Sequence, residues 1–412
     1  MSGVSGADAP GGVARGRWEI REGDCLESLR AMPDESVQTC VTSPPYWGLR
    51  DYGHGDQLGM EETPDLFVAN MVKVFAEVRR VLRDDGTLWL NIGDSYAGSW
   101  GNQGRKSERG TQRPINGEML SPVHDGRYPD AGSNTGKIPE GANFKAKDLV
   151  GIPWLLAFAL RADGWYLRSE IIWAKPNPMP ESVTDRPTKA HEQVFLLTKS
   201  PRYFYDADAV REEGAMVSGE SRGGSLGRGP VSEPTNMVAG FNHSGAGFVG
   251  SGHRNKRTVW TVATQPFSGA HFATFPPKLI EPMILAGSPP KCCGVCSAPW
   301  QRVVERTRSG KVERAGMSAV TTLRNDAAAH EGRIGETSTK TVGWEPTCEH
   351  NDDTGSSVVL DPFSGSGTTG MVALRHDRSY IGLELNPEYA AMSRNRIRDD
   401  APLLNTHLEA AA

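Results

Sequence analysis

Apolar residues recur along the chain with two periods, one typical of strands and one typical of helices. Short apolar runs at residues 18–20, 37–42 and 87–92 predict strands, because strands are brief and rich in β-branched and aromatic side chains. Before the third run, apolar residues recur at helical spacing after Thr63-Pro64, a hydroxyl cap followed by a proline at the first helical position. Gly86 is expected to end this helix. The β-α-β alternation predicts an α/β fold with a mostly parallel, doubly wound sheet.

The alternation continues after residue 148. The expected elements are a helix at 152–162, a strand at 165–173, a hairpin of 193–198 and 202–205 around Ser200-Pro201, a short strand at 258–264, a helix at 277–286, and a β-α-β-α unit at 358–398. Residues 97–147 and 211–258 interrupt the pattern. They are rich in glycine, serine and arginine, which predicts two exposed loop insertions.

Composition narrows the class of protein. Charged residues make up 23% of the 412-residue chain and hydrophobic residues 37%, an ordinary soluble balance. The formal net charge of −5 gives no global attraction to nucleic acid, so any such contact must come from local basic patches. No run of about 18 apolar residues occurs, and the polar N-terminal tail does not resemble a signal peptide. We therefore expect a cytoplasmic protein.

Two stretches suit a ligand site better than a core. Thr42-Ser43-Pro44-Pro45-Tyr46-Trp47 ends an apolar run with two prolines and two aromatic residues, which can hold a flat polar ring at a sheet edge. The second stretch, Asp361 to Gly370, is a glycine-rich turn leading into a helix, whose backbone can approach a ligand closely. Glu384 ends the next apolar run, where a carboxylate can accept both hydroxyls of a ribose. By itself the glycine turn also fits a nicotinamide-dependent oxidoreductase or a plain tight turn, whereas the absence of Lys-Ser/Thr after the glycines argues against a P-loop.

Taken together, the two stretches resemble the S-adenosylmethionine-dependent amino-methyltransferases of DNA. The Ser-Pro-Pro-Tyr motif precedes the glycine motif, which is similar to the order in the circularly permuted β group of that family. The resemblance implies a Rossmann-like methyltransferase sheet as the fold and double-stranded DNA as the substrate. It also implies this organisation: a disordered tail (1–15), a catalytic half (16–96), a flexible insertion (97–147), the remainder of the catalytic sheet (148–210), a target-recognition segment (211–258), a cofactor-completing segment (259–290), a Cys/His insert (291–354), an S-adenosylmethionine-binding half (355–400) and a tail (401–412).

The resemblance also implies roles for individual residues. Ser43 and the Pro44 carbonyl would accept hydrogen bonds from the target amine, Pro45 would help to fix the backbone, and Tyr46 would stack on a base turned out of the duplex. The residues implied at the co-substrate are Asp24, Phe363, Gly365, Gly367, Thr368 and Glu384. Asp24 is equally readable as an ordinary helix cap.

The first residue of the Ser-Pro-Pro-Tyr motif bears on the base. In the family that this motif resembles, serine at the position of Ser43 is associated with methylation of the N4 amine of cytosine, and aspartate or asparagine with methylation of the N6 amine of adenine. The sequence therefore favours N4-cytosine, with N6-adenine as the alternative and a non-catalytic DNA-binding protein as a remote one. No Pro-Cys dipeptide occurs, so attack on cytosine C5 by a thiolate is disfavoured.

A third pattern is a pair of cysteine motifs. Cys293-Gly294-Val295-Cys296 and Cys348-Glu349-His350 offer four ligands suited to tetrahedral zinc, and Cys292 could substitute for Cys293. The competing interpretation is a set of reduced cysteines in a loop. A zinc-knuckle-like insert would be structural.

Partners follow from the resemblance rather than from a motif. Arginines and lysines in segment 211–258 and in the 97–147 insertion suit contacts to DNA. A homodimer and a separate cognate restriction enzyme are further hypotheses, in the cytoplasm of a bacterial or phage-infected cell and at the nucleoid when DNA is bound. No motif identifies a target sequence.

Overall fold

The structure is a computed structural model that describes residues 16–48, 57–97, 144–213, 253–265, 274–309 and 336–402. The tail predicted at 1–15 lies outside these residues, as do most of the 97–147 insertion, the 211–258 segment and the 401–412 tail. The chain divides into two compact units, of which the larger comprises Met1–Ala209, Thr258–Gln301 and Pro346–Ala412.

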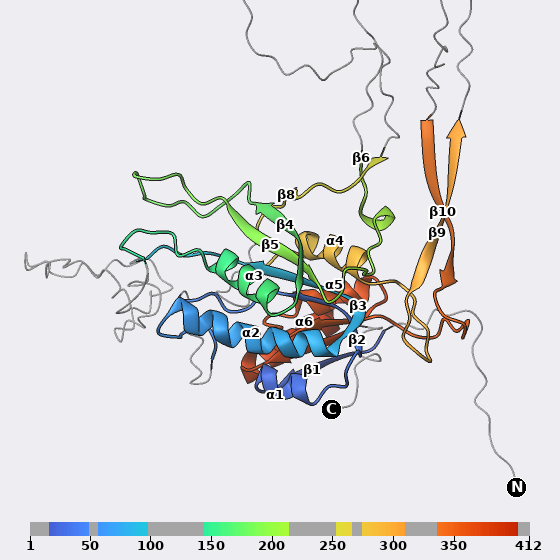
Figure 1. Ribbon diagram of the computed structural model, residues 1–412, viewed down its shortest axis with the longest axis horizontal. Coiled ribbons are helices and arrows are strands. Elements are labelled where there is room, and N and C mark those ends of the chain that lie inside the picture. The colour runs from blue at the N-terminus through green and yellow to red at the C-terminus, as the bar shows by residue number, and fades with distance from the viewer. Residues whose placement is uncertain are drawn as a thin grey trace, which may run out of the picture. The chain divides into compact units, whose positions relative to one another are not determined.

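The larger unit is built on an eight-stranded sheet (Figure 1). In spatial order its strands are β1 (Trp18–Glu22), β12 (Ser379–Glu384), β11 (Val358–Asp361), β2 (Val37–Thr42), β3 (Leu82–Ile92), β5 (His191–Thr198), β4 (Tyr166–Ala174) and β8 (Val259–Thr261). β5 is antiparallel to both of its neighbours, and the other neighbouring strands run parallel. The prediction of a mostly parallel sheet is confirmed.

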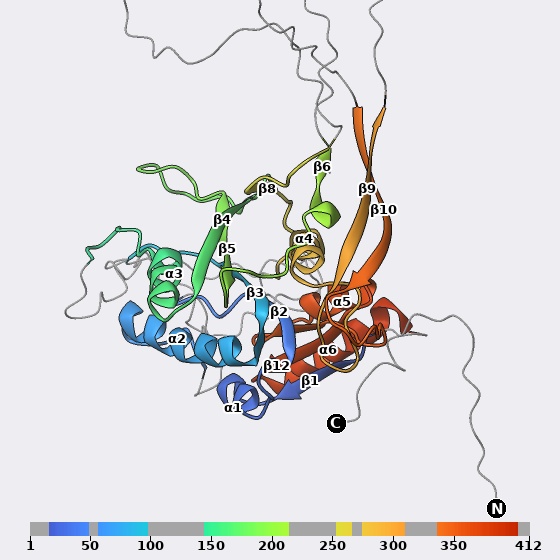
Figure 2. The same ribbon diagram turned by 45° about the vertical axis from the view of Figure 1, so that its right-hand side comes forward.

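Helices cover both faces of this sheet (Figure 2). One face carries α1 (Cys25–Arg30), α2 (Pro64–Val81) and α3 (Ile152–Ala162), and the other carries α4 (Pro277–Gly287), α5 (Thr368–Arg375) and α6 (Pro387–Asp400). The central strand β2 is buried on both sides, since all six of its residues are buried. This is the doubly wound arrangement expected from the sequence.

Helix α2 shows how the sequence sets the local structure. The Thr63 hydroxyl accepts a hydrogen bond from the Leu66 amide at 3.2 Å, which caps the helix as predicted. The helix ends at Val81, however, and not at Gly86. Strand β3 already begins at Leu82, and its register with β2 shifts between Leu82 and Thr87. Gly86 therefore lies in an irregular part of the ladder, and the predicted helix end is wrong because strand pairing overrides the glycine signal.

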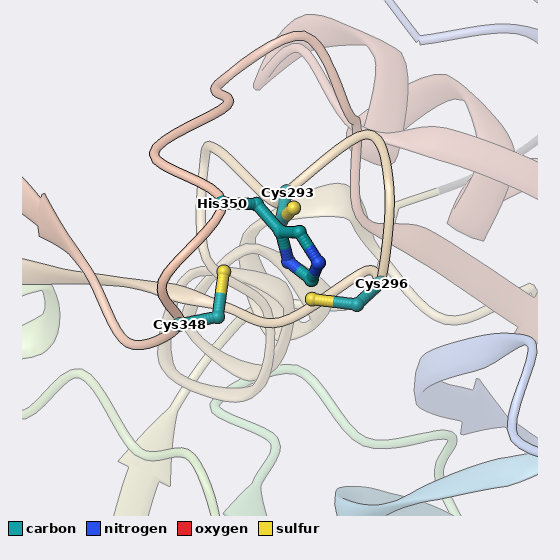
Figure 3. Close-up of side chains that lie close together, drawn as sticks. All are labelled: Cys293, Cys296, Cys348 and His350. Carbon is teal, nitrogen blue, oxygen red and sulfur yellow. The ribbon is translucent and has the colours of Figure 1, made fainter.

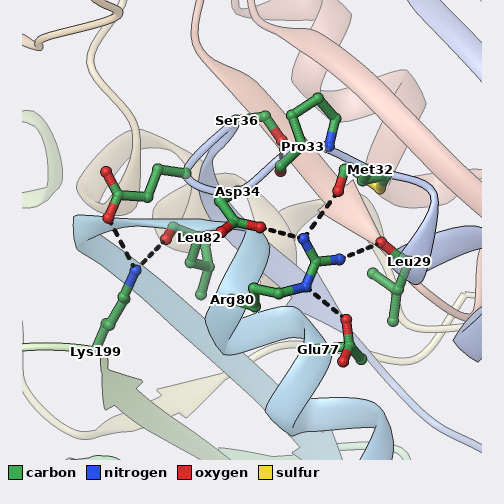
Figure 4. Close-up of polar contacts among 10 residues, drawn as sticks. Leu29, Met32, Pro33, Asp34, Ser36, Glu77, Arg80, Leu82 and Lys199 are labelled. Carbon is green, nitrogen blue, oxygen red and sulfur yellow. Dashed lines mark hydrogen bonds and ion pairs between the residues drawn. The ribbon is translucent and has the colours of Figure 1, made fainter.

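Arg80 fastens α2 to the loop after α1 (Figure 4). Its guanidinium donates to the carbonyls of Leu29 at 2.7 Å and Met32 at 2.9 Å, and it pairs with Glu77 and Asp34. Nearby, Lys199 Nζ donates to the Leu82 carbonyl at 2.9 Å. These contacts join segments that precede and follow β2, so they help to fix where β2 begins.

The predicted hairpin of 193–198 and 202–205 is wrong. Residues 193–198 belong to β5, but residues 202–205 form no strand. The physical reason is that β3 and β4 occupy both edges of β5, leaving no free backbone edge for a third partner. The Phe204 amide donates instead to the Asp85 carbonyl at 2.9 Å.

The remaining described elements are small. A 3-10 helix spans Asp208–Val210, and β6 (Glu212–Glu213) pairs with β7 (His253–Arg254). A two-stranded ribbon joins β9 (Trp300–Ser309) to β10 (Glu336–Pro346). None of the helices in the described residues is long and apolar enough to cross a membrane.

Candidate functional site

Four neighbouring parallel strands end at one edge of the sheet and carry the predicted site residues there. Ser43 follows β2, Phe363 follows β11, Glu384 ends β12, and Asp24 lies two residues after β1. The chain leaves β11 and β2 in opposite directions, toward β12 by way of α5 and toward β3 by way of α2. In open α/β sheets, ligands bind at such a reversal, in a crevice outside the carboxyl ends of the strands.

Asp361 joins the two sequence motifs across this reversal. Its carboxylate accepts hydrogen bonds from the Thr42 hydroxyl at 2.6 Å and the Thr369 hydroxyl at 2.8 Å. The Phe363 amide also donates to it, at 3.1 Å. The side chain is fully buried, and burial raises the pKa of Asp361 to about 6 despite these hydrogen bonds. The end of β2 and the start of the glycine turn are therefore held together by one carboxyl group.

The glycine turn lies at this edge of the sheet, between β11 and α5. Gly365 and Gly367 have φ values of +52° and +74°, a left-handed conformation that favours glycine. Among the described residues, only the Phe363 carbonyl, at 3.8 Å, would lie within 4 Å of a Cβ on Gly365, so that side of the turn is open to them. Glu384 supports the turn, because its carboxylate accepts from the Gly365 amide at 2.8 Å and the Asn386 amide at 3.0 Å. Burial raises the pKa of Glu384.

Arg396 is a supporting residue that the sequence did not reveal. It reaches from α6 to the turn and donates to the hydroxyls of Ser366 at 2.8 Å and Thr368 at 2.6 Å. Burial lowers the pKa of its guanidinium. Basic residues in an amphipathic helix are usually solvated, so no sequence signal distinguished Arg396 from its neighbours.

Asp24 lies beside Glu384 but has a local partner. The Gly23 amide donates to the Glu384 carbonyl at 2.9 Å, which places the start of α1 at the same sheet edge. The Asp24 carboxylate caps α1 by accepting from the Glu27 amide at 2.9 Å. Asp24 Oδ1 therefore caps the helix, whereas Asp24 Oδ2 accepts no hydrogen bond from the described residues of α1.

Tyr46 is held by a chain of hydroxyl and carboxylate groups. The Ser43 hydroxyl donates to the Tyr46 hydroxyl at 3.4 Å, and the Tyr46 hydroxyl donates to Glu192 Oε2 at 2.7 Å. Glu192 forms an ion pair with Lys175, and Asn91 Oδ1 lies 3.2 Å from the Tyr46 hydroxyl. Glu192 and Asn91 come from β5 and β3, so only the sheet brings them to the Ser-Pro-Pro-Tyr segment. No role was predicted for Glu192 from the sequence.

The Tyr46 ring lies directly against Gly93. A Cβ placed on Gly93 would be 2.5 Å from Tyr46 Cε2 and 2.9 Å from Cδ2. The backbone after Gly93 is fixed, because the Asp94 carboxylate accepts from the amides of Gly151 at 2.9 Å and Ile152 at 3.1 Å at the start of α3. Burial raises the pKa of Asp94. The ring therefore rests on a rigid surface made by glycine.

The predicted metal ligands also come together. The ligand atoms of Cys293, Cys296, Cys348 and His350 all lie within 4.8 Å of one another. Cys292 does not take the place of Cys293, because its Sγ lies 3.2 Å from the Ser357 hydroxyl in a buried position outside this group.

Known proteins with similar sequences were compared with the chain. The sequence model of the family N6_N4_Mtase, described as DNA methylase, matches residues 37–293 and 346–395. The Type II methyltransferase M.Cfr9I of Citrobacter freundii is 40% identical over 379 residues, which cover 92% of this chain and 87% of that protein. The Type II methyltransferase M.SmaI of Serratia marcescens is 36% identical over 379 residues, which cover 92% of this chain and 90% of that protein.

Among solved structures, the PvuII DNA methyltransferase (cytosine-N4-specific) is similar over 96% of this chain and 94% of its own length, with 16% identity and a TM-score of 0.49. The family match spans more than half of the chain, and M.Cfr9I is 40% identical over 92% of this chain's length. The chain therefore belongs to the DNA methylase family, as an S-adenosylmethionine-dependent DNA amino-methyltransferase.

Proposed function

We propose that this enzyme methylates the exocyclic N4 amine of cytosine in duplex DNA, with the base turned out of the helix into the crevice at Ser43 and Tyr46. Its substrate class, DNA, follows from the family. A base inside a duplex is stacked and paired, so its amine can reach a crevice at a sheet edge only after rotation out of the stack. The proposed platform for the rotated base is the Tyr46 ring, which is backed by Gly93.

The observation that carries the proposal is the direction of the hydrogen bonds at Ser43. The Ser43 hydroxyl donates toward Tyr46, and Tyr46 donates toward the carboxylate of Glu192. With its proton directed toward Tyr46, Ser43 Oγ would have lone pairs available to accept from an amine N–H. An acceptor is what this chemistry needs, since a base amine is a poor nucleophile until its lone pair is localised on nitrogen.

The remaining roles are proposed from position. The Pro44 carbonyl would be the second acceptor for the amine, and Pro45 would restrict the backbone so that this carbonyl keeps its orientation. Transfer would form the N–C bond and break the sulfonium S–C bond of the co-substrate, and one amine proton would pass to water. Bound S-adenosylmethionine would supply the electrophilic methyl group. No covalent bond from the protein to the base is required.

Residues at the same edge of the sheet are suited to hold the co-substrate. The side of Gly365 that faces away from Phe363 is open, the Glu384 carboxylate is preset by two amides, and Asp24 lies on the adjacent strand end. We therefore propose that the methionine portion lies along the glycine turn and the ribose at Glu384. The full set proposed to hold the co-substrate is Asp24, Phe363, Gly365, Gly367, Thr368 and Glu384. The circularly permuted motif order predicted from the sequence is part of this proposal.

The second candidate is methylation of adenine N6 by the same site. Membership of the methylase family decides against a nicotinamide-dependent oxidoreductase and a non-catalytic DNA-binding protein. Within the family, Ser43 favours cytosine. A cognate restriction enzyme is proposed by analogy with relatives that are named Type II methyltransferases. A homodimer, the DNA-recognition role of segment 211–258 and association with the nucleoid stay predictions.

Nucleoside analysis tests the base. Unmethylated genomic DNA is incubated with the enzyme and isotopically labelled S-adenosylmethionine, digested to nucleosides and separated by mass spectrometry. We expect label in N4-methyldeoxycytidine. Label in N6-methyldeoxyadenosine alone would overturn the proposed base while leaving the family assignment intact.

Two serines that flank the same strand make a matched pair. Ser43→Ala is expected to lower kcat by about 10²-fold, the usual cost of losing one preorganised hydrogen-bonding group at the reacting atom. Ser36→Ala is the control, because Ser36 precedes β2 at the opposite edge of the sheet and donates only to the Pro33 carbonyl at 2.8 Å. Equal activity of both variants would contradict the assignment of Ser43 to the reacting amine.

A further inference from the structure

Three cysteines and a histidine meet where an insertion leaves and rejoins the catalytic unit (Figure 3). The family model matches residues up to 293 and again from 346, so residues 294–345 lie between the two matched stretches. Cys293 and Cys296 stand at the beginning of this insertion, and Cys348 and His350 just after its end. The cluster therefore joins the two ends of a segment that the family model leaves out.

The geometry of the cluster is close to that of a tetrahedral site. All four ligand atoms lie within 4.8 Å of one another. In a tetrahedral zinc site with Zn–S bonds of about 2.3 Å, neighbouring sulfur atoms are about 3.8 Å apart. Side-chain rotations that move the ligand atoms by about 1 Å or less would therefore complete the site.

The first ligand pair lies in a compact turn. The Ser297 amide donates to the Cys293 carbonyl at 2.8 Å, and the Val295 amide donates to Cys293 Sγ at 3.4 Å. Ser297 adopts a left-handed conformation with φ of 57°, which tightens the turn. Arg83 Nη1 donates to the Cys296 carbonyl at 3.0 Å and so attaches the turn to the start of β3.

The second ligand pair is fastened to the first by contacts that do not involve the ligands. The Thr347 hydroxyl donates to the Pro299 carbonyl at 2.6 Å, and the Trp300 indole donates to the Asp352 carbonyl at 3.0 Å. The two loops are thus placed side by side by the fold itself. Such preorganisation distinguishes a built site from cysteines that happen to be near one another.

We propose that Cys293, Cys296, Cys348 and His350 bind one structural zinc ion that closes the base of insertion 294–345. Three thiolates and one imidazole are a ligand set that zinc favours and that calcium and magnesium do not. Four protein ligands leave no open coordination position for a substrate, so the ion has no catalytic role. Its function is to hold the start of β9 and the end of β10 in fixed positions relative to the sheet.

Metal analysis of the tag-free protein, purified without added metal, is the first test. We expect about one zinc per chain by plasma mass spectrometry, because a closed site of this type binds zinc tightly at neutral pH. After removal of the metal by a thiol-reactive mercurial and a chelator, cobalt(II) should give the visible absorption of a tetrahedral thiolate complex. Less than a tenth of an equivalent of zinc, or iron in its place, would overturn the proposal.

Adjacent cysteines provide a matched pair of variants. Cys293→Ser is expected to lower the zinc content at least tenfold, as is His350→Ala, whose exposed side chain can be removed with little effect on packing. Cys292→Ser should keep the zinc, since Cys292 contacts Ser357 outside the cluster. Zinc retained at wild-type levels in Cys293→Ser and His350→Ala would refute the ligand assignment.

Limited proteolysis separates a structural ion from a passively bound one. Removal of the zinc should speed cleavage in the two described ends of the insertion, 294–309 and 336–345, at least tenfold while the catalytic sheet stays resistant. Unchanged cleavage rates in these two ends would show that the ion does not hold the base of the insertion. Neither readout depends on methyl transfer, so failure here leaves the proposed reaction untouched.

Discussion

The contact between Tyr46 and Gly93 gives a direct test of the base-binding platform. An alanine Cβ at residue 93 would lie 2.5 Å from Cε2, 2.9 Å from Cδ2 and 3.3 Å from Cζ of the Tyr46 ring. Carbon atoms in favourable contact are about 3.5–4.0 Å apart, so the ring must move by about 1 Å. Gly93 does not have a left-handed conformation, so the substitution Gly93→Ala acts through this collision rather than through backbone strain.

A displacement of this size is costly for a reaction that depends on positioning. Misplacing a reacting group by about 1 Å can slow catalysis about 10²-fold. We therefore expect Gly93→Ala to lower kcat/KM by about 10²-fold, which corresponds to about 2.7 kcal/mol of transition-state stabilisation. Affinity for S-adenosylmethionine should stay unchanged, because Gly93 follows β3 and the glycine turn follows β11.

The loss of kcat/KM is measured by single-turnover transfer of a labelled methyl group to DNA. The affinity for S-adenosylmethionine is measured by calorimetric titration. Gly343→Ala is the control, since no atom of the residues that the structure describes would lie within 4 Å of a Cβ there. Circular dichroism establishes that each variant is folded. If folded Gly93→Ala transfers methyl groups as fast as the wild type, the Tyr46 ring does not position the base.

Two further predictions concern the groups around the crevice. The pKa of Asp361 is 3.8 in the unfolded state and about 6 in the folded state, so between these values the folded protein binds more protons at this carboxyl group. As pH rises from about 4 to about 6, the wild type should therefore lose about 3 kcal/mol of stability relative to Asp361→Asn. Above about pH 6 no further loss is expected. Urea unfolding of both proteins across this range measures the difference, and a difference independent of pH would contradict the burial argument. Glu192→Gln should lower kcat about tenfold, since a neutral acceptor holds the Tyr46 hydroxyl less strongly. Glu281→Gln on α4 is the control and should leave kcat unchanged. Equal rates for the two variants would show that Glu192 does not position Tyr46.

Local signals were sufficient for most of the elements and for both motifs. Thr63-Pro64 marked the start of α2 because capping depends on neighbouring residues only. The glycines at 365 and 367 marked a turn because only glycine adopts positive φ without strain, and both have positive φ in the structure. Family resemblance then connected two motifs more than 300 residues apart, which no local pattern could do.

Where sequence-based reasoning failed, long-range pairing decided the outcome. Gly86 did not end a helix, because β3 begins at Leu82 to pair with β2. Residues 202–205 did not form a hairpin, because β3 and β4 already flank β5. Signals from single residues carry no information about which strand edges are already occupied.

The sequence by itself determined the strand and helix alternation, the two motifs and the pairs of cysteines, since each is encoded within a few neighbouring residues. Only the tertiary structure decided which side chains surround Tyr46, because Gly93 and Glu192 reach it from β3 and β5. It also decided between Cys292 and Cys293, since two adjacent residues of one type differ only in the direction their side chains take. A carboxyl group such as Asp361 acquires its raised pKa from the same source, because burial is a property of the packed sheet and not of the local sequence.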